Sequence, residues 1–271
     1  FDLFSGATVT INGVTIKKGD ATGPAIPGGA ITVQSGAELT LSNSIVENNM
    51  GGNGGAISND GVLTVTQTIF QNNTATNGGA INNGGALVLT DVEFDGNTAS
   101  DLGGGLNTTS GATLNNVTFV GNSAMTGGGL RANGGGTVSL SNVTISGNTA
   151  DTGGGIFTSK LIDVTNSTIT GNTALSGGGN GGGIMASGAS GDAQLKNTIL
   201  SANVGGNTSK KLTSLGYNIS DDNNSFTATT GDMPNTDPQI ASLQDNGGFV
   251  RTHALLSGSD AIDNGTTTGA P

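Results

Sequence analysis

The carboxylates of this sequence are the residues best suited to acid–base or cation chemistry. Asp91, Glu93 and Asp95 alternate along one short segment. Acid–base catalysis on a glycan needs two carboxylates, or a carboxylate and a basic group, within a few ångströms of each other. The positions about 25 residues before and after this segment carry neutral side chains, and that spacing recurs along the chain. The sequence therefore favours a solvated acidic patch over a catalytic or metal site.

A second group of carboxylates lies near the C-terminus, together with His253, the only histidine. Cys is absent, which excludes thiolate catalysis, disulfides and Cys-ligated metals. A histidine-based metal site would need several carboxylates beside His253, so we expect a structural capping role for it. We predict no catalytic residue and no cofactor or metal. Clustered oxygens suit Ca²⁺, and its candidate ligands would be Asp221, Asp222, Asp232 and Asp237.

Charge and composition narrow the possible partners and folds. The 271 residues include 19 acidic and 8 basic ones, which gives a net charge of −11 and disfavours nucleic acid and anionic lipid as partners. No apolar stretch approaches the roughly 20 residues that span a bilayer. Gly occurs 50 times, while aromatic residues make up 3% and Trp is absent. A core packed on large side chains is therefore disfavoured, and periodicity must decide the fold.

Two short patterns recur with one period of about 25 residues, the signature of a repeat protein. The first reads Gly-Gly-(Ala/Gly)-(Ile/Leu), and the second is an apolar residue followed three positions later by Asn. Identical amides in successive repeats can bond to one another, as Asn ladders do between stacked strands. We therefore predict a structural ladder of Asn49, Asn73, Asn97, Asn122, Asn148, Asn172 and Asn203.

Between these patterns, apolar and polar residues alternate as they do in a strand with one buried face. Gly, Thr, Asn and Val are poor helix formers, which argues against a helical repeat. Three short strands with their turns fit one triangular coil of about 25 residues. The predicted inward core column is Leu41, Val65, Leu89, Leu114, Leu140, Val164 and Leu195. A polar column that marks a corner is Asn43, Gln67, Asp91, Asn116, Asn142, Asn166 and Asn197.

The sequence thus predicts an all-β, right-handed parallel β-helix, or β-solenoid, of about eight three-sided coils over residues 1–203. Residues 204–271 lose the period but keep apolar side chains. An open last coil would expose unpaired strand edges. We therefore expect residues 204–271 to form an aperiodic C-terminal cap over that coil, or an assembly segment that meets another subunit.

The repeat patterns resemble those of a known group of surface proteins. Gly-Gly-Ala-Ile at 54–57 and 78–81, with Phe-x-x-Asn at 70–73, 94–97 and 119–122, resembles the repeats of polymorphic outer-membrane proteins, autotransported adhesins. The segments 215–219, 236–238, 243–248 and 253–263 are similar to the end of bacterial choice-of-anchor Q domains. The resemblance implies an exported bacterial β-helix at the cell surface.

Three functions remain open at this point. The leading hypothesis is a non-catalytic extracellular adhesin or structural subunit, which could stack end to end into a fibre and meet a glycan or another cell-surface ligand. The alternative is a polysaccharide lyase, hydrolase or epimerase, which would need carboxylates on adjacent coils of one exposed sheet. A carbohydrate-binding module would need exposed aromatic rings, for which Phe157 and Tyr217 are candidates. The outward position after each glycine-rich pattern carries no carboxylate: Thr32, Ser58, Asn82, Asn107, Arg131, Phe157 and Met185.

Overall fold

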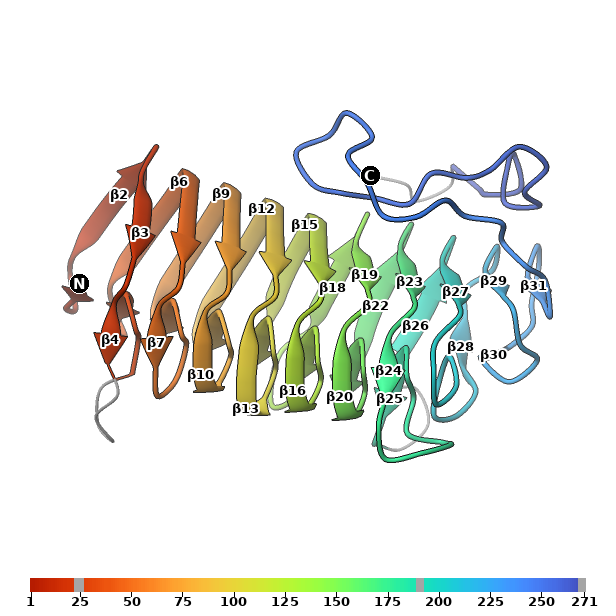
Figure 1. The fold of residues 1–271 in the computed structure, drawn as a ribbon, viewed down its shortest axis with the longest axis horizontal. Helices are drawn as coiled ribbons and strands as arrows, with labels where there is room; N and C mark the ends of the chain where they lie inside the picture. The colour runs from red at the N-terminus through yellow and green to blue at the C-terminus, as the bar shows by residue number, and fades with distance from the viewer. Residues whose placement is uncertain (22–26, 189–192, 268–271) are drawn as a thin grey trace.

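The computed structural model describes residues 1–21, 27–188 and 193–267, whose regular elements are β-strands (Figure 1). The strands pair in parallel, and successive partners are one repeat apart: Leu89 pairs with Val65 on one side and with Leu114 on the other. A chain that returns to the same sheet once per repeat is a parallel solenoid, so the predicted all-β class is confirmed. In the described residues, no helix is long and apolar enough to cross a membrane.

In residues 1–21, 27–188 and 193–267, the strands form three sheets, which we call sheets A, B and C. Sheet A has eight short strands: β1 (Asp2–Leu3), β5 (Ile31–Val33), β8 (Ile57–Asn59), β11 (Ile81–Asn83), β14 (Leu106–Thr108), β17 (Leu130–Ala132), β21 (Ile156–Thr158) and β25 (Ile184–Ala186). Sheet C has seven: β4 (Asp20–Ala21), β7 (Met50–Gly51), β10 (Thr74–Asn77), β13 (Thr98–Leu102), β16 (Ser123–Thr126), β20 (Thr149–Thr152) and β24 (Thr173–Ala174).

Sheet B is the largest, with 16 strands. Its first half begins with β2 (Thr8–Asn12) and β3 (Thr15–Lys17). It continues with the four longest strands of the described residues: β6 (Glu38–Glu47), β9 (Val62–Gln71), β12 (Ala86–Asp95) and β15 (Ala112–Val120). Shorter strands follow: β18 (Val138–Ser141), β19 (Thr144–Ser146), β22 (Ile162–Thr165), β23 (Thr168–Thr170), β26 (Ala193–Lys196), β27 (Ile199–Ser201), β28 (Leu212–Ser214), β29 (Ile219–Ser220), β30 (Phe226–Thr227) and β31 (Met233–Pro234).

A left-handed residue bends every coil in the middle of sheet B. Asn43, for example, has φ of 50° and Asp91 has φ of 55°. Asn and Asp adopt this region more readily than other non-glycine residues do. The bend turns the second half of each coil towards a new face, which explains the predicted polar corner column. Its members all have positive φ: Asn43, Gln67, Asp91, Asn116, Asn142, Asn166 and Asn197.

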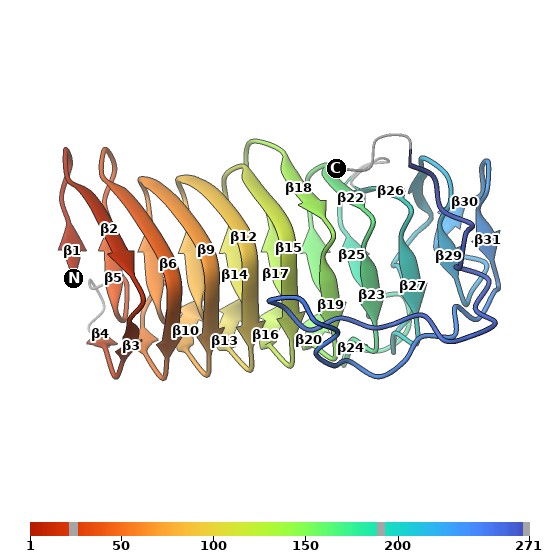
Figure 2. The same ribbon diagram turned by 90° about the horizontal axis from the view of Figure 1, so that it is seen from above.

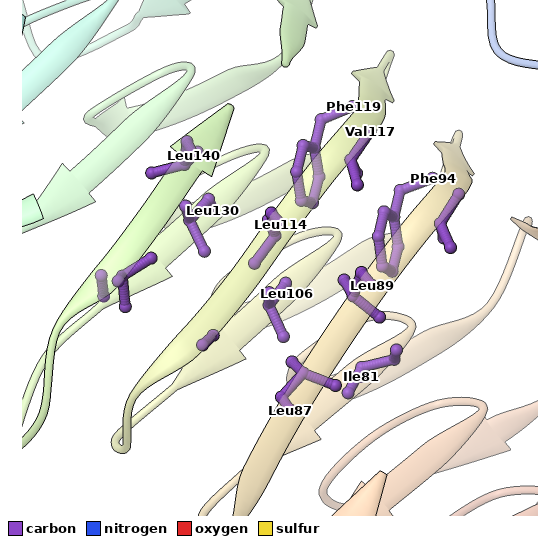
Figure 3. Close-up of a cluster of buried hydrophobic side chains, with 14 of the residues drawn as sticks. Ile81, Leu87, Leu89, Phe94, Leu106, Leu114, Val117, Phe119, Leu130 and Leu140 are labelled. Carbon is purple, nitrogen blue, oxygen red and sulfur yellow. The ribbon is translucent and has the colours of Figure 1, made fainter. Parts of the chain in front are cut away.

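The interior is a continuous apolar column along the rod. Successive members of the predicted core column pair in register from Leu41 to Leu195, and each is at most 1% exposed. Beside them, the rings of Phe70 and Phe94 stack at 5.2 Å between centroids, and those of Phe94 and Phe119 at 4.6 Å. Figure 3 shows Phe94 and Phe119 at equivalent places on neighbouring strands, with Leu89 and Leu114 beside them.

The rod extends beyond the boundary at residue 203 that the sequence suggested. Strands β28 and β29 pair with β26 and β27, and β30 and β31 add a further layer. The period is lost there because the coils shorten, yet Leu212, Ile219 and Phe226 still occupy buried positions. Sheet C's seven strands give seven coils with a strand in all three sheets, close to the predicted eight.

Residues 235–267, which we call the strap, run back along the rod. Figures 1 and 2 both show this blue segment returning from β31 towards the middle of the molecule, along the side that carries β27, β23 and β19. We expected the tail to cover the last coil with its apolar residues. Leu212 and Phe226 instead complete the core, and Leu256 of the strap is 47% exposed. Polar partners on the outer face of sheet B hold the strap there.

Candidate functional site

The predicted asparagines form an unbroken amide ladder inside the rod. The Nδ2 atom of Asn73 donates to Oδ1 of Asn97 at 2.9 Å, and that same oxygen accepts the backbone N–H of Asn73 at 3.0 Å. Each Nδ2 also donates to a backbone carbonyl of the preceding coil, such as that of Val46 for Asn73. The pattern repeats from Asn49 to Asn203. This column therefore satisfies the polar groups of the turns, which is a structural role.

The last rung of the ladder uses residues that the sequence did not single out for it. Asn203 Nδ2 donates to Asn207 Oδ1 at 2.8 Å, and Asn207 Nδ2 donates to Asp221 Oδ1 at 2.6 Å. Asp221 also accepts the backbone N–H of Ala202 at 2.7 Å. A carboxylate can accept without needing to donate, so it suits the end of a chain of amide donors.

The four aspartates considered for Ca²⁺ do not converge. Asp232 accepts from Ser214 and from the backbone N–H of Asn218, whereas Asp237 accepts from the backbone of Gln239. Burial acts to raise the pKa of Asp222, but hydrogen bonds from the Ser225 side chain and from backbone N–H groups outweigh it, so the net pKa is lowered. Across the described residues, no three His, Asp or Glu side chains are placed to hold a metal ion. These carboxylates stabilise turns.

The acidic segment of β12 is bound by an arginine from the strap. Arg251 Nη2 lies 2.6 Å from Glu93 Oε1 and 2.7 Å from Asp95 Oδ2, and its Nε donates to Glu93 Oε1 at 2.9 Å. Hydrogen bonding to Glu93 is the main cause that raises the pKa of Arg251. The expected solvated patch is therefore wrong for Glu93, which is only 6% exposed. Asp91 stands apart at the corner and accepts from Asn116.

Other strap residues continue this attachment along sheet B. Thr118 Oγ1 donates to the backbone carbonyl of Arg251 at 2.7 Å. His253 Nδ1 donates to the Ala241 carbonyl at 2.6 Å, while its Nε2 lies 3.0 Å from Ser146 Oγ. Near the strap's end, Asn197 Nδ2 donates to the Thr266 carbonyl at 2.8 Å. His253 thus fastens the strap to the flank of the rod, and does not cap its end as expected.

The strap and the outer face of sheet B enclose a groove of about 350 Å³. Its polar lining includes Asn166, Thr168, Asn197, His253 and Asn264, all within the described residues. Its apolar lining comes from Tyr217, Ile199, Ile219, Met233 and Leu255. None of the residues that line it is Asp, Glu, Lys or Arg. A volume of this size with mixed lining lies within the range of small-molecule sites, so we take it as the candidate functional site.

The outward column of sheet A is where β-helical enzymes would need carboxylates. It carries hydrogen-bonded amide and guanidinium groups instead. Asn107 Nδ2 donates to Asn82 Oδ1 at 2.6 Å, and Arg131 donates to Asn107 Oδ1 at 2.9 Å. The guanidinium carbon of Arg131 lies 6.0 Å from the ring centroid of Phe157, a cation–π distance. Burial lowers the pKa of Arg131, although the charge of Asp101 opposes this. Phe157 therefore already has a partner, unlike a free aromatic platform.

Arg251 is the functional residue that sequence reasoning missed. It forms no periodic pattern, and its partners lie 156 and 158 residues away. The sequence did contain one signal. The chain has two arginines, Arg131 and Arg251, and Arg251 lies in the aperiodic tail. The acidic group Asp91, Glu93 and Asp95 has no basic residue one repeat before or after it.

Comparison with known proteins gives a family for most of the rod. A family model described as "Right handed beta helix region" matches residues 3–160, which supplies the handedness and confirms the predicted right-handed parallel β-helix. No curated protein matches the chain, and no solved structure does.

Proposed function

The chain belongs to the right-handed β-helix family, and from this premise we propose that it is a non-catalytic extracellular surface protein, an adhesin or a structural subunit. The observation that carries the proposal is the use of Glu93 and Asp95. These two carboxylates on one strand face outwards, as a catalytic pair would, yet both bind Arg251. The two carboxylates attach the strap to the rod through Arg251.

Two further features support a surface role. The repeats resemble those of polymorphic outer-membrane proteins, and the C-terminal segments resemble choice-of-anchor Q domains, both found in exported bacterial β-helices. The rod's buried amide ladder makes each coil depend on the next, which suits a rigid spacer that displays its faces over many coils. End-to-end stacking into a fibre is part of the proposal.

The proposal predicts that the protein does not cleave polysaccharides. We expect no product above the buffer blank when it is incubated with polygalacturonate, alginate, xylan or cellulose, with Ca²⁺ or with EDTA. The measurements are new reducing ends and absorbance of unsaturated uronides. Product release that Glu93→Gln abolishes, and that Asp163→Asn on β22 leaves intact, would replace the proposal with the polysaccharide-active alternative.

A further inference from the structure

Tyr217 occupies a position where the seven residues of the corner column are Asn, Gln or Asp. It follows Asn166 and Asn197 at the corner of sheet B, and its φ of 62° continues their values of 52° and 48°. Its backbone N–H donates to the Thr230 carbonyl at 3.0 Å, which fixes the turn. The left-handed region is costly for a bulky side chain, whereas Asn enters it readily. An aromatic ring placed there at such a cost suggests a function for the ring.

The surroundings hold this ring at the groove. Gly231, with φ of 74°, lies against it so closely that a Cβ atom at residue 231 would overlap the Tyr217 ring. Tyr217 also lines the groove beneath the strap. Gly231 thus limits where the ring can move beside the groove, which suits an aromatic platform.

Several polar groups of the groove have unused hydrogen-bonding capacity. Within the described part of the chain, Asn166 Nδ2, Thr168 Oγ1 and Asn264 Oδ1 have no hydrogen-bond partner, although Asn166 Oδ1 accepts from Asn197 and Asn264 Nδ2 donates to the Asp260 carbonyl. An amide donor, a hydroxyl and an amide acceptor thus border one small space. A ligand with several hydroxyl groups can bond to all three, since a hydroxyl both donates and accepts.

The charges of the site decide between neutral and ionic ligands. Among the residues that the structure describes, the groove is lined by no acidic or basic side chain other than His253, and both ring nitrogens of His253 already have partners. The chain as a whole carries a net charge of −11, which repels anions. Ile199 and Ile219 add apolar surface against which a carbon ring can pack.

We infer that the groove beneath the strap is a binding site for a neutral saccharide, with Tyr217 as its platform and Asn166, Thr168 and Asn264 as its hydrogen-bonding groups. This inference rests on the proposed non-catalytic function and gives it a ligand class. Binding would place a sugar ring beside Tyr217 while the amide and hydroxyl groups fix its hydroxyls.

The single tyrosine makes a direct experiment possible. The chain has one Tyr and no Trp, so tyrosine emission reports on residue 217 alone. We would titrate maltotetraose, cellotetraose and N-acetylated chitotetraose, with tetragalacturonate as the acidic comparison. At least one neutral saccharide should give a saturable change at about millimolar concentration. The absence of such a change for all three, or binding of tetragalacturonate alone, would overturn the inference.

Matched variants separate recognition from folding. Glycine accepts positive φ, so Asn166→Gly should keep the corner while weakening saccharide binding at least tenfold. Asn43→Gly makes the same change at the same corner, five coils away and outside the groove, and should bind like the unchanged chain. Tyr217→Asn introduces the residue type that five of the seven corner-column positions carry; by calorimetry it should lose binding without losing thermal stability.

The outcomes for this inference and for the proposed function are distinguishable. Equal binding by Asn166→Gly and Asn43→Gly would contradict the assigned site, even if the protein released no product from polysaccharides. Product release would contradict the non-catalytic proposal, even if Tyr217 emission reported saccharide binding.

Discussion

Asn122→Ala should lower the free energy of unfolding by about 4 kcal/mol, because it strands several buried polar groups that each cost roughly 1–3 kcal/mol when unpaired. Asn122 is 0% exposed. Its Nδ2 donates to the Phe94 carbonyl and to Asn148 Oδ1, each at 2.9 Å. Its Oδ1 accepts the backbone N–H of Asn97 at 2.9 Å and Asn97 Nδ2 at 3.0 Å. Alanine supplies none of these four bonds.

The measurement is urea unfolding followed by circular dichroism, with Asn53→Ala as the matched control. Asn53 is exposed, and its side chain accepts one bond from Asn77 Nδ2 at 2.9 Å. We expect the control to cost less than about 1 kcal/mol, since water can replace that bond. Equal losses for the two variants would contradict a stabilising ladder.

Phe94→Ala should cost about 3–5 kcal/mol, the usual range for truncating a buried phenylalanine. The Phe94 ring is fully buried between those of Phe70 and Phe119, at centroid separations of 5.2 and 4.6 Å. Removing the middle ring opens a cavity and breaks both stacking contacts. Coils of a solenoid contact mainly their neighbours, so the damage falls on the coil-to-coil interfaces that hold the rod together.

The same urea titration tests this result, with Phe249→Ala as its control. Phe249 lies in the strap and is 41% exposed, so its truncation should change the free energy of unfolding by less than about 1 kcal/mol. A loss for Phe94→Ala as small as that of the control would mean that the phenylalanine column is not the packed core described above.

The repeating part of the molecule could be predicted from the sequence because its signals recur. Leu89 was placed inside by alternation, and its register with Val65 and Leu114 followed from the period. Asn97 was placed in the ladder because its equivalents recur in every coil. Stacking gives equivalent positions of successive coils the same environment. A wrong assignment for one coil can therefore be recognised by comparison with the neighbouring coils.

The strap could not be predicted because its contacts occur once. The ion pair between Arg251 and Glu93 joins residues 158 positions apart, and neither alternation nor period bears on such a pair. Without Arg251, Glu93 was expected in solvent. The apolar residues of the tail predict that it covers part of the rod. Apolar content alone does not say which surface is covered, so the sequence wrongly favoured the last coil.

The sequence indicates the aromatic ring of Tyr217 but not its place in the coil. The corner residues Asn142, Asn166 and Asn197 are 24 and 31 positions apart, whereas Tyr217 follows Asn197 after only 20. The shorter coil hid the equivalence, and with it the substitution of an aromatic ring for an amide. The backbone conformation, φ of 62°, reveals it.

The groove forms only while the strap is fixed to the flank of the rod, because strap residues make one of its walls. The chain has no Cys, so spin labels can be placed at Val62→Cys on β9 and Phe249→Cys on the strap, residues that are 43% and 41% exposed. Double electron–electron resonance should give one narrow distribution of distances between the two labels, and Arg251→Gln should broaden it. If the labelled chain that keeps Arg251 gave a distribution as broad as that of the urea-unfolded chain, the strap would not be fixed to the rod.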